Sequence, residues 1–429
     1  MPDRTHAPAL SPLVIPELIP YSHSKLPNGI DLYILHDPSQ EVFRLDINFE
    51  AGAFYQPQPL IASTTLNMLN EGTLLHSSSE LAEIFDYYGA YVDFSNGQHK
   101  AEASLFSLTK YASQTIRLLG EMLMQSCFPE NELEIYLDNK RQHFLTEKQK
   151  TGWLARKKLA ELLFGPFHPY ANAVHTDDYG KVTRDLLLQY YQQRINARHC
   201  TILLTGNITD TIRQQTEQIF SQLPQPSDTP ATPDYNFESV EAGYYHVQKD
   251  DAVQSSIRIA HKGINLRDED YAGFLLLNTV IGGYFGSRLM SNIRESKGYT
   301  YGIHSFNVSL PLYSYWCVAT DVNREYTQAT IEEVRKEIRK IQTETIPEEE
   351  LSLVKNYLYG DLLRELDGVF AQSDGLKQKL LYGTDNNFYL QIIRKIKNYT
   401  AAELQDIANK HLHPDQLYIV TAGESTAHP

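Results

Sequence analysis

The chain has 429 residues, with 38 Lys and Arg against 53 Asp and Glu, and a formal net charge of −15. An acidic chain lacks the clustered cations that nucleic acids and anionic membranes attract, so we expect neither nucleic acid nor a membrane as a partner. The apolar fraction of 42% excludes wholesale disorder and predicts a soluble protein with a sizeable core.

The N-terminal segment comes first in the chain and contains five prolines within its first 20 residues. Proline breaks a helix, and no apolar stretch typical of a signal peptide occurs here, so we expect an extended arm on the surface. No run of apolar residues is long enough to span a bilayer. Cys127, Cys200 and Cys317 form no CxxC pair, which argues against a disulfide framework and a thiolate zinc site. From these missing signals we expect a cytoplasmic protein.

The first half of the chain mixes strands and helices. Alternating apolar and polar residues predict strands over 30–35 and 43–49. The residue patterns predict helices over 79–88, 110–125, 130–150 and 184–194.

A proline-rich segment then divides the chain near its middle. Residues 223–236 read LPQPSDTPATPDYN, a composition typical of an extended, solvated linker. We therefore predict an N-terminal domain over residues 1–222, a linker over 223–236 and a C-terminal domain over 237–429.

The second half has the same mixed character. Strands are predicted over 255–260, 304–310 and 315–320, and helices over 328–342 and 347–363. Pro347 is followed by three glutamates, which favours a helix start because Pro is tolerated in the first turn and carboxylates suit its positive end.

The two halves end alike. Residues 194–206 read RINARHCTILLTG and residues 411–423 read HLHPDQLYIVTAG, so a helix, a polar turn, an apolar strand and a Gly recur at an offset of 217 residues (423 − 206). Two chance helix-turn-strand units could also produce this pattern, but the linker lies between the copies. Together with strands in adjacent pairs and helices in separate runs, this predicts an α+β fold of two homologous domains, each with a largely antiparallel sheet packed by helices.

A family resemblance rests on several segments in the same order. Residues 282–301 read GGYFGSRLMSNIRESKGYTY, and this segment resembles the GGGxxSRLFxxLREKxGLAY pattern in the C-terminal half of the insulinase/pitrilysin family of zinc peptidases. The segments KLPNGIDLYIL at 25–35 and FHPY at 167–170 are similar to that family's opening strand and HPY turn. The resemblance covers almost the full length of the chain.

The family's zinc motif is degenerate in this chain. In an HxxEH motif on a helix, two His bind zinc and the Glu serves as general base. The family places this motif before a Met-Leu-x-x-Gly-Thr stretch, here residues 68–73, so the ligand positions correspond to Ser63, Leu66 and Asn67. The resemblance makes Glu147 the counterpart of the distal ligand. We expect no catalytic zinc in this chain, because one carboxylate cannot hold the ion against water.

An Arg and a Tyr that the family carries in its C-terminal half are present in this chain. Arg294 and Tyr301 match in type, context and spacing the Arg and Tyr that reach the substrate in the family. A guanidinium and a phenol are good donors to the oxyanion that forms when hydroxide attacks a peptide carbonyl. Without the surrounding resemblance, a surface helix residue and a half-buried strand residue would be the simpler interpretation.

An edge strand is the predicted peptide-binding element. Residues 89–104, GAYVDFSNGQHKAEAS, are similar to the family strand that adds an extended peptide to its sheet, and we assign Gly89, Ala90 and Tyr91 to substrate binding. An ordinary hairpin that turns at Asn96-Gly97 is compatible with this role.

The resemblance thus implies a non-catalytic subunit of a zinc metalloendopeptidase, similar to the metal-free subunits of bacterial two-subunit peptidases and of mitochondrial processing peptidase. It would form half of a chamber for unfolded peptide and donate Arg294 and Tyr301 to an HxxEH-bearing homologous subunit that holds the zinc. Alone, it would not be a peptidase. One alternative is a structural or binding protein, such as a homodimeric scaffold with no role in proteolysis. Another is an active peptidase with a different ligand set.

Overall fold

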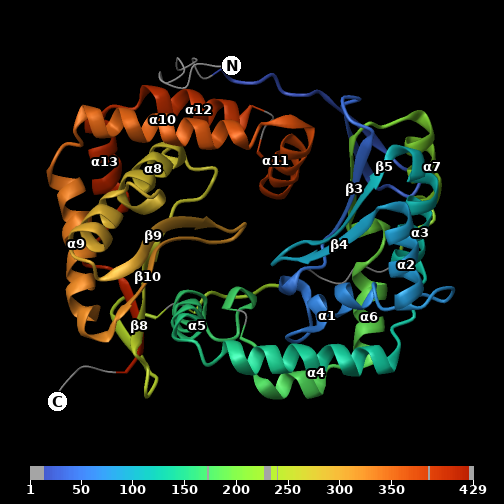
Figure 1. The fold of residues 1–429 in the computed structure, drawn as a ribbon, viewed down its shortest axis with the longest axis horizontal. Coiled ribbons are helices and arrows are strands. Elements are labelled where there is room, and N and C mark those ends of the chain that lie inside the picture. The colour runs from blue at the N-terminus through green and yellow to red at the C-terminus, as the bar shows by residue number, and fades with distance from the viewer. Residues whose placement is uncertain (1–13, 172, 227–232, 239, 385–386, 425–429) are drawn as a thin grey trace, which may run out of the picture.

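The computed structural model describes residues 14–424, except for residues 172, 227–232, 239 and 385–386. Two halves face each other, and each half combines one sheet with several helices (Figure 1). The predicted α+β fold of two homologous domains is confirmed.

The N-terminal half begins with a short strand where the surface arm was predicted. Residues 1–13 of that arm lie outside the described residues, and its last residues start strand β1. The strands are β1 (Tyr21–Lys25), β2 (Asp31–His36), β3 (Val42–Phe49), β4 (Tyr91–Asn96), β5 (Ala101–Leu108) and β6 (Cys200–Gly206). The helices are α1 (Ile61–Met68), α2 (Ser78–Tyr88), α3 (Ala112–Met124), α4 (Glu130–Glu147), α5 (Thr151–Phe164), α6 (Arg184–Arg194) and α7 (Asp210–Phe220).

The C-terminal half follows the same plan. Its strands are β7 (Tyr244–Gln248), β8 (Gln254–Lys262), β9 (Thr300–Ser309), β10 (Ser314–Asn323) and β11 (Tyr418–Gly423). The α-helices are α8 (Tyr271–Asn278), α9 (Thr327–Thr343), α10 (Glu348–Arg364), α11 (Gly368–Tyr382), α12 (Phe388–Asn398) and α13 (Ala401–His411). Two π-helical turns, η6 (Thr279–Gly283) and η7 (Met290–Ser296), lie between α8 and β9.

Local sequence explains several of these boundaries. Ser77 and Glu80 form a reciprocal capping box at the start of α2, and Thr400 and Glu403 do the same for α13. Pro347 directly precedes α10, which begins one residue after the predicted helix start and carries Glu348, Glu349 and Glu350 in its first turn. In the two capping boxes, side chains accept hydrogen bonds from backbone N–H groups that the first helical turn leaves unpaired.

The two sheets share one topology, except that β1 adds a further strand to the first sheet. The first sheet has the order β1-β2-β6-β3-β5-β4 and the second has the order β7-β11-β8-β10-β9. Strand β6 runs parallel to β2 and antiparallel to β3, and β11 runs parallel to β7 and antiparallel to β8. The starts of α5 and α11, and of α6 and α13, are also 217 residues apart (368 − 151 and 401 − 184). The repeat predicted from the chain ends therefore extends through both halves.

Two helices lie between the sheets and are exchanged between the halves. Helix α5 of the N-terminal half packs on β8 and β11 of the second sheet, and α11 of the C-terminal half packs on β2 and β6 of the first (Figure 1). The α5 contact buries an apolar cluster that includes Leu159, Leu163 and Phe164 with Ala260 and Val420. Each half thus supplies a helix that covers the inner face of the other half's sheet.

An aromatic cluster joins the halves on the α5 side. The ring of Phe164 lies 5.2 Å from that of Tyr313, which belongs to the β9–β10 loop. Nearby, Nε2 of His99 lies 2.5 Å from the hydroxyl of Tyr170, a residue of the predicted HPY turn. Burial lowers the pKa of His99 to about 4, so this imidazole is neutral near pH 7.

Because it contains buried histidines, we expect the folded protein to lose stability in mild acid. Burial also lowers the pKa of His261 to about 4, from an ordinary value of 6.5. Between these two pH values the unfolded chain binds a proton at His261 that the folded chain does not bind. The contribution of the neutral His261 to the free energy of unfolding is therefore fully present above pH 6.5 and is lost as the pH falls towards 4. We expect His261→Phe, which keeps the ring stacked on Trp316, to reduce this pH dependence. Urea midpoints at about pH 7 and about pH 5 measure it, and parallel pH profiles for both proteins would contradict the assignment.

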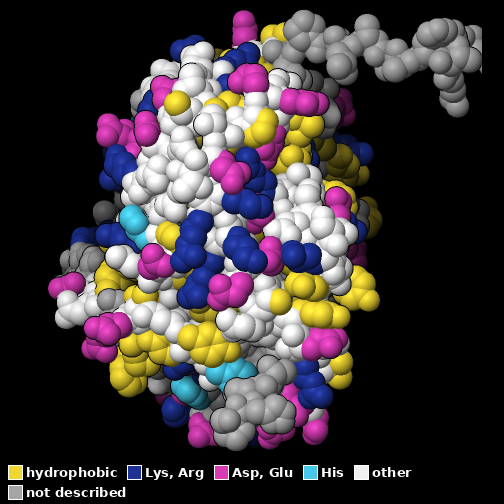
Figure 2. All heavy atoms as spheres, turned by 90° about the vertical axis from the view of Figure 1, so that its left-hand side faces the viewer, with side chains coloured by type: hydrophobic (Ala, Val, Ile, Leu, Met, Phe, Trp, Pro, Cys, Tyr) yellow, Lys and Arg dark blue, Asp and Glu magenta, His cyan; other side chains and the backbone are white. Residues whose placement is uncertain are grey.

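The outer face of the C-terminal half carries mixed charges. Figure 2 shows basic and acidic side chains interspersed over this face. On α9, Lys336 pairs with Glu333 and Lys340 with Glu337, each three residues apart. No single sign of charge dominates this helix. Within the described residues, every helix is too short or too polar to cross a membrane.

Candidate functional site

Helix α1 carries the three degenerate ligand positions. The side-chain hydroxyl of Ser63 donates to the carbonyl of Leu60 at 3.2 Å, and Nδ2 of Asn67 donates to the carbonyl of Ser63 at 2.7 Å. Leu66 is 1% exposed and packs in the core. The polar groups of Ser63 and Asn67 are therefore bonded to their own helix, and the helix offers neither an imidazole nor a carboxylate. This donor set does not fit zinc.

Glu147, the expected remnant of the distal ligand, ends α4 and is paired with Lys150. Its Oε1 lies 2.5 Å from Nζ of Lys150 and 4.0 Å from Nε2 of His143. The hydrogen bond from Lys150 lowers the pKa of Glu147. The carboxylate is thus ionised and engaged by neighbouring side chains of the same segment.

One group of potential metal ligands occurs elsewhere in the described part of the chain. Ligand atoms of Asp268, Asp270 and His411 lie within 4.8 Å of one another. Nζ of Lys410 is 2.6 Å from Oδ2 of Asp270, and Nε2 of His411 is 2.8 Å from the same oxygen. An ammonium group therefore already neutralises the central carboxylate, and the group is explained as an ion-pair cluster.

Arg294 and Tyr301 lie next to each other. Arg294 belongs to η7, which continues beyond it to Ser296, and Tyr301 is the second residue of β9. Nε of Arg294 donates to the main-chain carbonyl of Tyr301 at 3.1 Å. The Arg294 guanidinium also lies over the ring of Phe285, 4.6 Å from its centroid. The π-helical turn and the strand thus hold the two residues as one unit.

The Tyr301 side chain points away from the protein. It is 93% exposed, whereas the simpler interpretation of the sequence was a half-buried strand residue. The register between β9 and β10 shifts by one residue at this point, so Tyr301 and Gly302 both oppose Asp321. Such a bulge bends a strand and redirects its side chains. The hydroxyl of Thr300 donates to the carbonyl of Asp321 at 2.8 Å and fixes the bulge.

Strand β4 provides the predicted peptide-binding segment. Gly89 ends α2 in the left-handed conformation (φ 58°), Ala90 is buried, and Tyr91 is 57% exposed and stacks on Phe106. In the first sheet, β4 is the terminal strand and pairs with β5 alone among the described strands. A terminal strand presents unpaired main-chain groups, to which an extended peptide can bind.

The parts of the predicted site belong to different halves. Helix α1 packs on α6 and β4 in the N-terminal half, whereas β9 packs on β10 and α8 in the C-terminal half (Figure 1). The structure therefore brings Arg294 to Tyr301, and α1 to β4, but it assembles no catalytic centre from the two groups.

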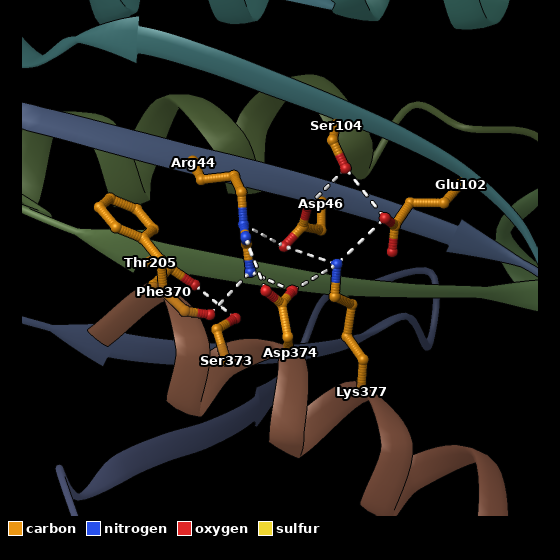
Figure 3. Close-up of polar contacts among 9 residues, drawn as sticks. All are labelled: Arg44, Asp46, Glu102, Ser104, Thr205, Phe370, Ser373, Asp374 and Lys377. Atoms are coloured by element: carbon orange, nitrogen blue, oxygen red, sulfur yellow. Dashed lines mark hydrogen bonds and ion pairs between the residues drawn. The ribbon is translucent and has the colours of Figure 1, made fainter. Parts of the chain in front are cut away.

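A buried charge cluster was not predicted from the sequence. Nη2 of Arg44 lies 2.7 Å from Oδ1 of Asp374, and Nε of Arg44 lies 2.9 Å from Oδ2 of Asp46 (Figure 3). Nζ of Lys377 lies 3.0 Å from both Glu102 and Asp374. The cluster joins β3 and β5 of the first sheet to α11 of the other half.

The electrostatics of this cluster favour the charged forms. Burial opposes the charge on Arg44, but Asp46 and Asp374 outweigh burial and raise the pKa of the guanidinium. The pKa of Lys377 is raised in the same way, with burial opposed by Asp46 and Glu102. The only sequence signal was the alternation of β3, which places Arg44 and Asp46 on one face of the sheet.

The chain is similar to known proteins. Residues 181–358 match the family model for the peptidase M16 inactive domain. The uncharacterized zinc protease YmxG of Bacillus subtilis is 21% identical over 362 residues, which cover 83% of this chain and 87% of that protein. The non-peptidase homolog YmxG of Helicobacter pylori is 21% identical over 364 residues, or 83% of each chain.

A solved structure has the same fold. The peptidase M16 inactive domain from Pseudomonas fluorescens superposes with a TM-score of 0.82 at 24% identity, covering 95% of this chain and 99% of that one. With the degenerate ligand positions on α1, these similarities support a non-catalytic role. Residues 181–358 thus resemble the inactive domain of peptidase family M16, and the chain as a whole shares the fold of the solved M16 structure.

Proposed function

We propose that this chain is the non-catalytic subunit of a zinc endopeptidase and supplies Arg294 and Tyr301 to the active site of a homologous, HxxEH-bearing subunit. The observation that carries the proposal is the Tyr301 side chain, which is 93% exposed at a strand bulge while Arg294 holds its backbone. A large aromatic side chain in this position buries little surface within its own chain. Because the bulge holds it pointing outward, it is placed to contact another molecule.

The chemistry of the pair fits transfer between subunits. As hydroxide attacks a peptide carbonyl, its oxygen gains negative charge, which a phenol O–H and guanidinium N–H groups stabilise. A guanidinium has five N–H donors. In Arg294, Nε is bonded to Tyr301 and Nη1 lies 3.9 Å from Glu295, so donors remain for a substrate. Neither residue has to carry a metal or transfer a proton, so the pair can act on a centre held by a different chain.

The same chain would hold part of the substrate. An unfolded peptide would add to the free edge of β4 next to Gly89, Ala90 and Tyr91, mainly through main-chain hydrogen bonds. Each subunit would contribute one half of the chamber that encloses the peptide.

Mixing the two subunits tests the proposal. We expect the purified chain alone to cleave no unstructured peptide, and the mixture with its zinc-bearing partner to cleave it faster than the partner alone. The partner would be identified by co-purification with a tagged version of this chain. If a stable complex forms but the chain adds nothing to the partner's kcat/KM, the proposal is wrong.

A scaffold without a role in proteolysis is the second candidate. It is favoured by the contacts of Arg294, whose bond to Tyr301 and stacking on Phe285 give this side chain a structural use in its own fold. A scaffold accounts for Arg294 but gives no reason for an exposed Tyr301. A self-associated chain that shows no peptidase activity in any co-purified complex would support this candidate.

A further inference from the structure

A cavity of 230 Å³ lies between α5 and strand β10 of the second sheet. Residues of α5 form most of its wall, and Tyr170, Ala171 and Tyr315 complete it. Leu159 and Leu163 give it an apolar side, which belongs to the cluster between α5 and the second sheet. Because α5 comes from the N-terminal half and β10 from the C-terminal half, the cavity lies where the two halves meet (Figure 1).

The charged side chains that line this cavity are both cationic. They are Arg156 and Lys157, and no Asp or Glu occurs among the described residues of the lining. Nζ of Lys157 is 3.9 Å from Glu161, a carboxylate outside the lining that also lies 3.7 Å from Lys158. Within the described part of the chain, Arg156 forms no ion pair. Two positive charges therefore border the cavity with one distant carboxylate to balance them.

The two cations lie against the aromatic part of the wall. Burial raises the pKa of Tyr315 to about 12, and the positive charge of Arg156 opposes this rise. Nζ of Lys157 lies over the ring of Trp153, 5.3 Å from its centroid. The Tyr315 phenol and the Trp153 indole also carry neutral donors. Cations and donors beside apolar surface suit an anion that is joined to an apolar group.

The internal repeat shows how the equivalent place is neutralised in the other half. Helix α11 is the counterpart of α5, and its contact with the first sheet contains three carboxylates. The helix offset of 217 residues (374 − 157) and the register of the strands define their counterparts on the α5 side. These are Lys157 for Asp374, Arg258 for Asp46 and Cys317 for Glu102. None of the three positions on the α5 side carries an acid, so an anion from outside the chain can take that place.

We propose that this cavity binds a carboxylate joined to an apolar group, as in a peptide whose last residue is Leu or Phe. Arg156 and Lys157 donate to the carboxylate, and Leu159, Leu163 and Phe164 pack on the apolar part. That the carboxylate belongs to a peptide rests on the proposed function, whereas the binding chemistry does not. An acidic side chain of a peptide offers the same group, and the experiment distinguishes the two sources.

The emission of Trp153 reports whether the cavity is occupied. The chain has two tryptophans, and the other, Trp316, is fully buried and donates to Asn278 in the core of the C-terminal half. A change in emission when a ligand enters the cavity is therefore assigned to Trp153, and Trp153→Phe should abolish it.

Three small probes are titrated into the full chain. N-acetyl-leucine carries the carboxylate of a C-terminal residue, N-acetyl-leucinamide is its neutral match, and N-acetylglutamate α-amide carries the carboxylate on its side chain. We expect N-acetyl-leucine to bind with a dissociation constant of roughly 1 mM, as a probe of this size allows, and at least about tenfold tighter than the amide. Added salt should reduce this preference. Whichever acid binds more tightly identifies the source of the carboxylate.

Three variants separate the cavity from the general charge of α5. Arg156→Gln and Lys157→Gln should each weaken N-acetyl-leucine by about tenfold and leave N-acetyl-leucinamide unchanged. Arg156→Gln should melt at the wild-type temperature, because its side chain is exposed and has no ion pair to lose. Lys158→Gln is the matched control, since Lys158 shares Glu161 with Lys157 but does not line the cavity. It should bind like the wild type.

The outcomes distinguish this site from the function on which its ligand rests. Equal binding of N-acetyl-leucine and its amide, or unchanged binding in Arg156→Gln and Lys157→Gln, would overturn the site. An equal loss in Lys158→Gln would also overturn it, because the effect would then follow the charge of the helix. Failure of the proposed function would appear instead as a mixture of subunits whose activity does not depend on this chain, while the isolated chain still binds N-acetyl-leucine.

Discussion

In a complex with the zinc-bearing subunit, the double variant Arg294→Ala/Tyr301→Phe is expected to lower kcat/KM by about 100-fold or more. Losing one preorganised oxyanion donor typically costs a factor of about 100 to 1,000. Tyr301→Phe alone removes one hydroxyl and keeps the ring, so its effect reports the phenol donor directly. The hydroxyl serves no purpose in the chain's own fold, because the side chain is 93% exposed.

The controls for this experiment come from the same chain. Tyr87 on α2 is another exposed tyrosine, at 80%, and Tyr87→Phe should leave kcat/KM unchanged. Binding of the variant subunit to its partner, measured by gel filtration, should match the wild type. An intact complex with unchanged kcat/KM in the double variant would contradict donation by the pair.

Asp46→Ala is expected to have the largest effect on stability, with a loss of about 3 kcal/mol or more. Asp46 is fully buried, accepts a hydrogen bond from Ser104 at 2.6 Å and lies between Arg44 and Lys377 (Figure 3). Its removal leaves the buried Arg44 and the partly buried Lys377 with Asp374, which is half exposed, and Glu102 as their remaining partners. Urea unfolding measures the change in the free energy of unfolding.

A matched surface variant shows whether the loss of stability in Asp46→Ala comes from the burial of the carboxylate or only from the loss of its charge. Asp415 pairs with Arg339 at 3.2 Å, but both side chains are largely exposed, at 84% and 58%. Asp415→Ala should therefore cost less than about 1 kcal/mol, because an exposed ion pair contributes little. Equal losses in Asp415→Ala and Asp46→Ala would show that the cluster between α11 and the first sheet does not behave as a buried network.

Local pattern in the sequence predicted many elements well. The helix predicted over 184–194 matches α6, and the strands predicted over 30–35 and 43–49 match β2 and β3 to within one residue at each end. These segments carry strong periodicity and clear start signals, such as Thr183, which caps α6. The repeated chain ends also predicted correctly that β6 and β11 are equivalent strands.

Long-range packing could not be predicted in the same way. Arg44 and Asp374 are 330 residues apart, and no local pattern relates them. The exchange of α5 and α11 between the halves is likewise a property of the fold, because either helix could cover its own sheet without any change in its periodicity. The charge cluster of Arg44, Asp46, Asp374 and Lys377 depends on that exchange and was missed for this reason.

The candidate site was predicted in type but not in geometry. Resemblance to the family identified Arg294 and Tyr301 by residue type and spacing. The hydrogen bond between them and the bulge that exposes Tyr301 depend on the register of β9 and β10, which the sequence does not reveal. The role of the pair, the peptide-binding role of Gly89, Ala90 and Tyr91, the domain boundaries and the identity of the partner remain predictions.

Zinc content and peptidase activity of the isolated chain test the central claim most directly. The chain would be purified without chelators, dialysed against zinc and measured by elemental analysis alongside hydrolysis of an unstructured peptide. We predict far less than one tightly bound zinc per chain and no hydrolysis, because Ser63, Leu66 and Asn67 offer no ligand set on α1. One tightly held zinc per chain, with hydrolysis that a chelator abolishes, would contradict the account.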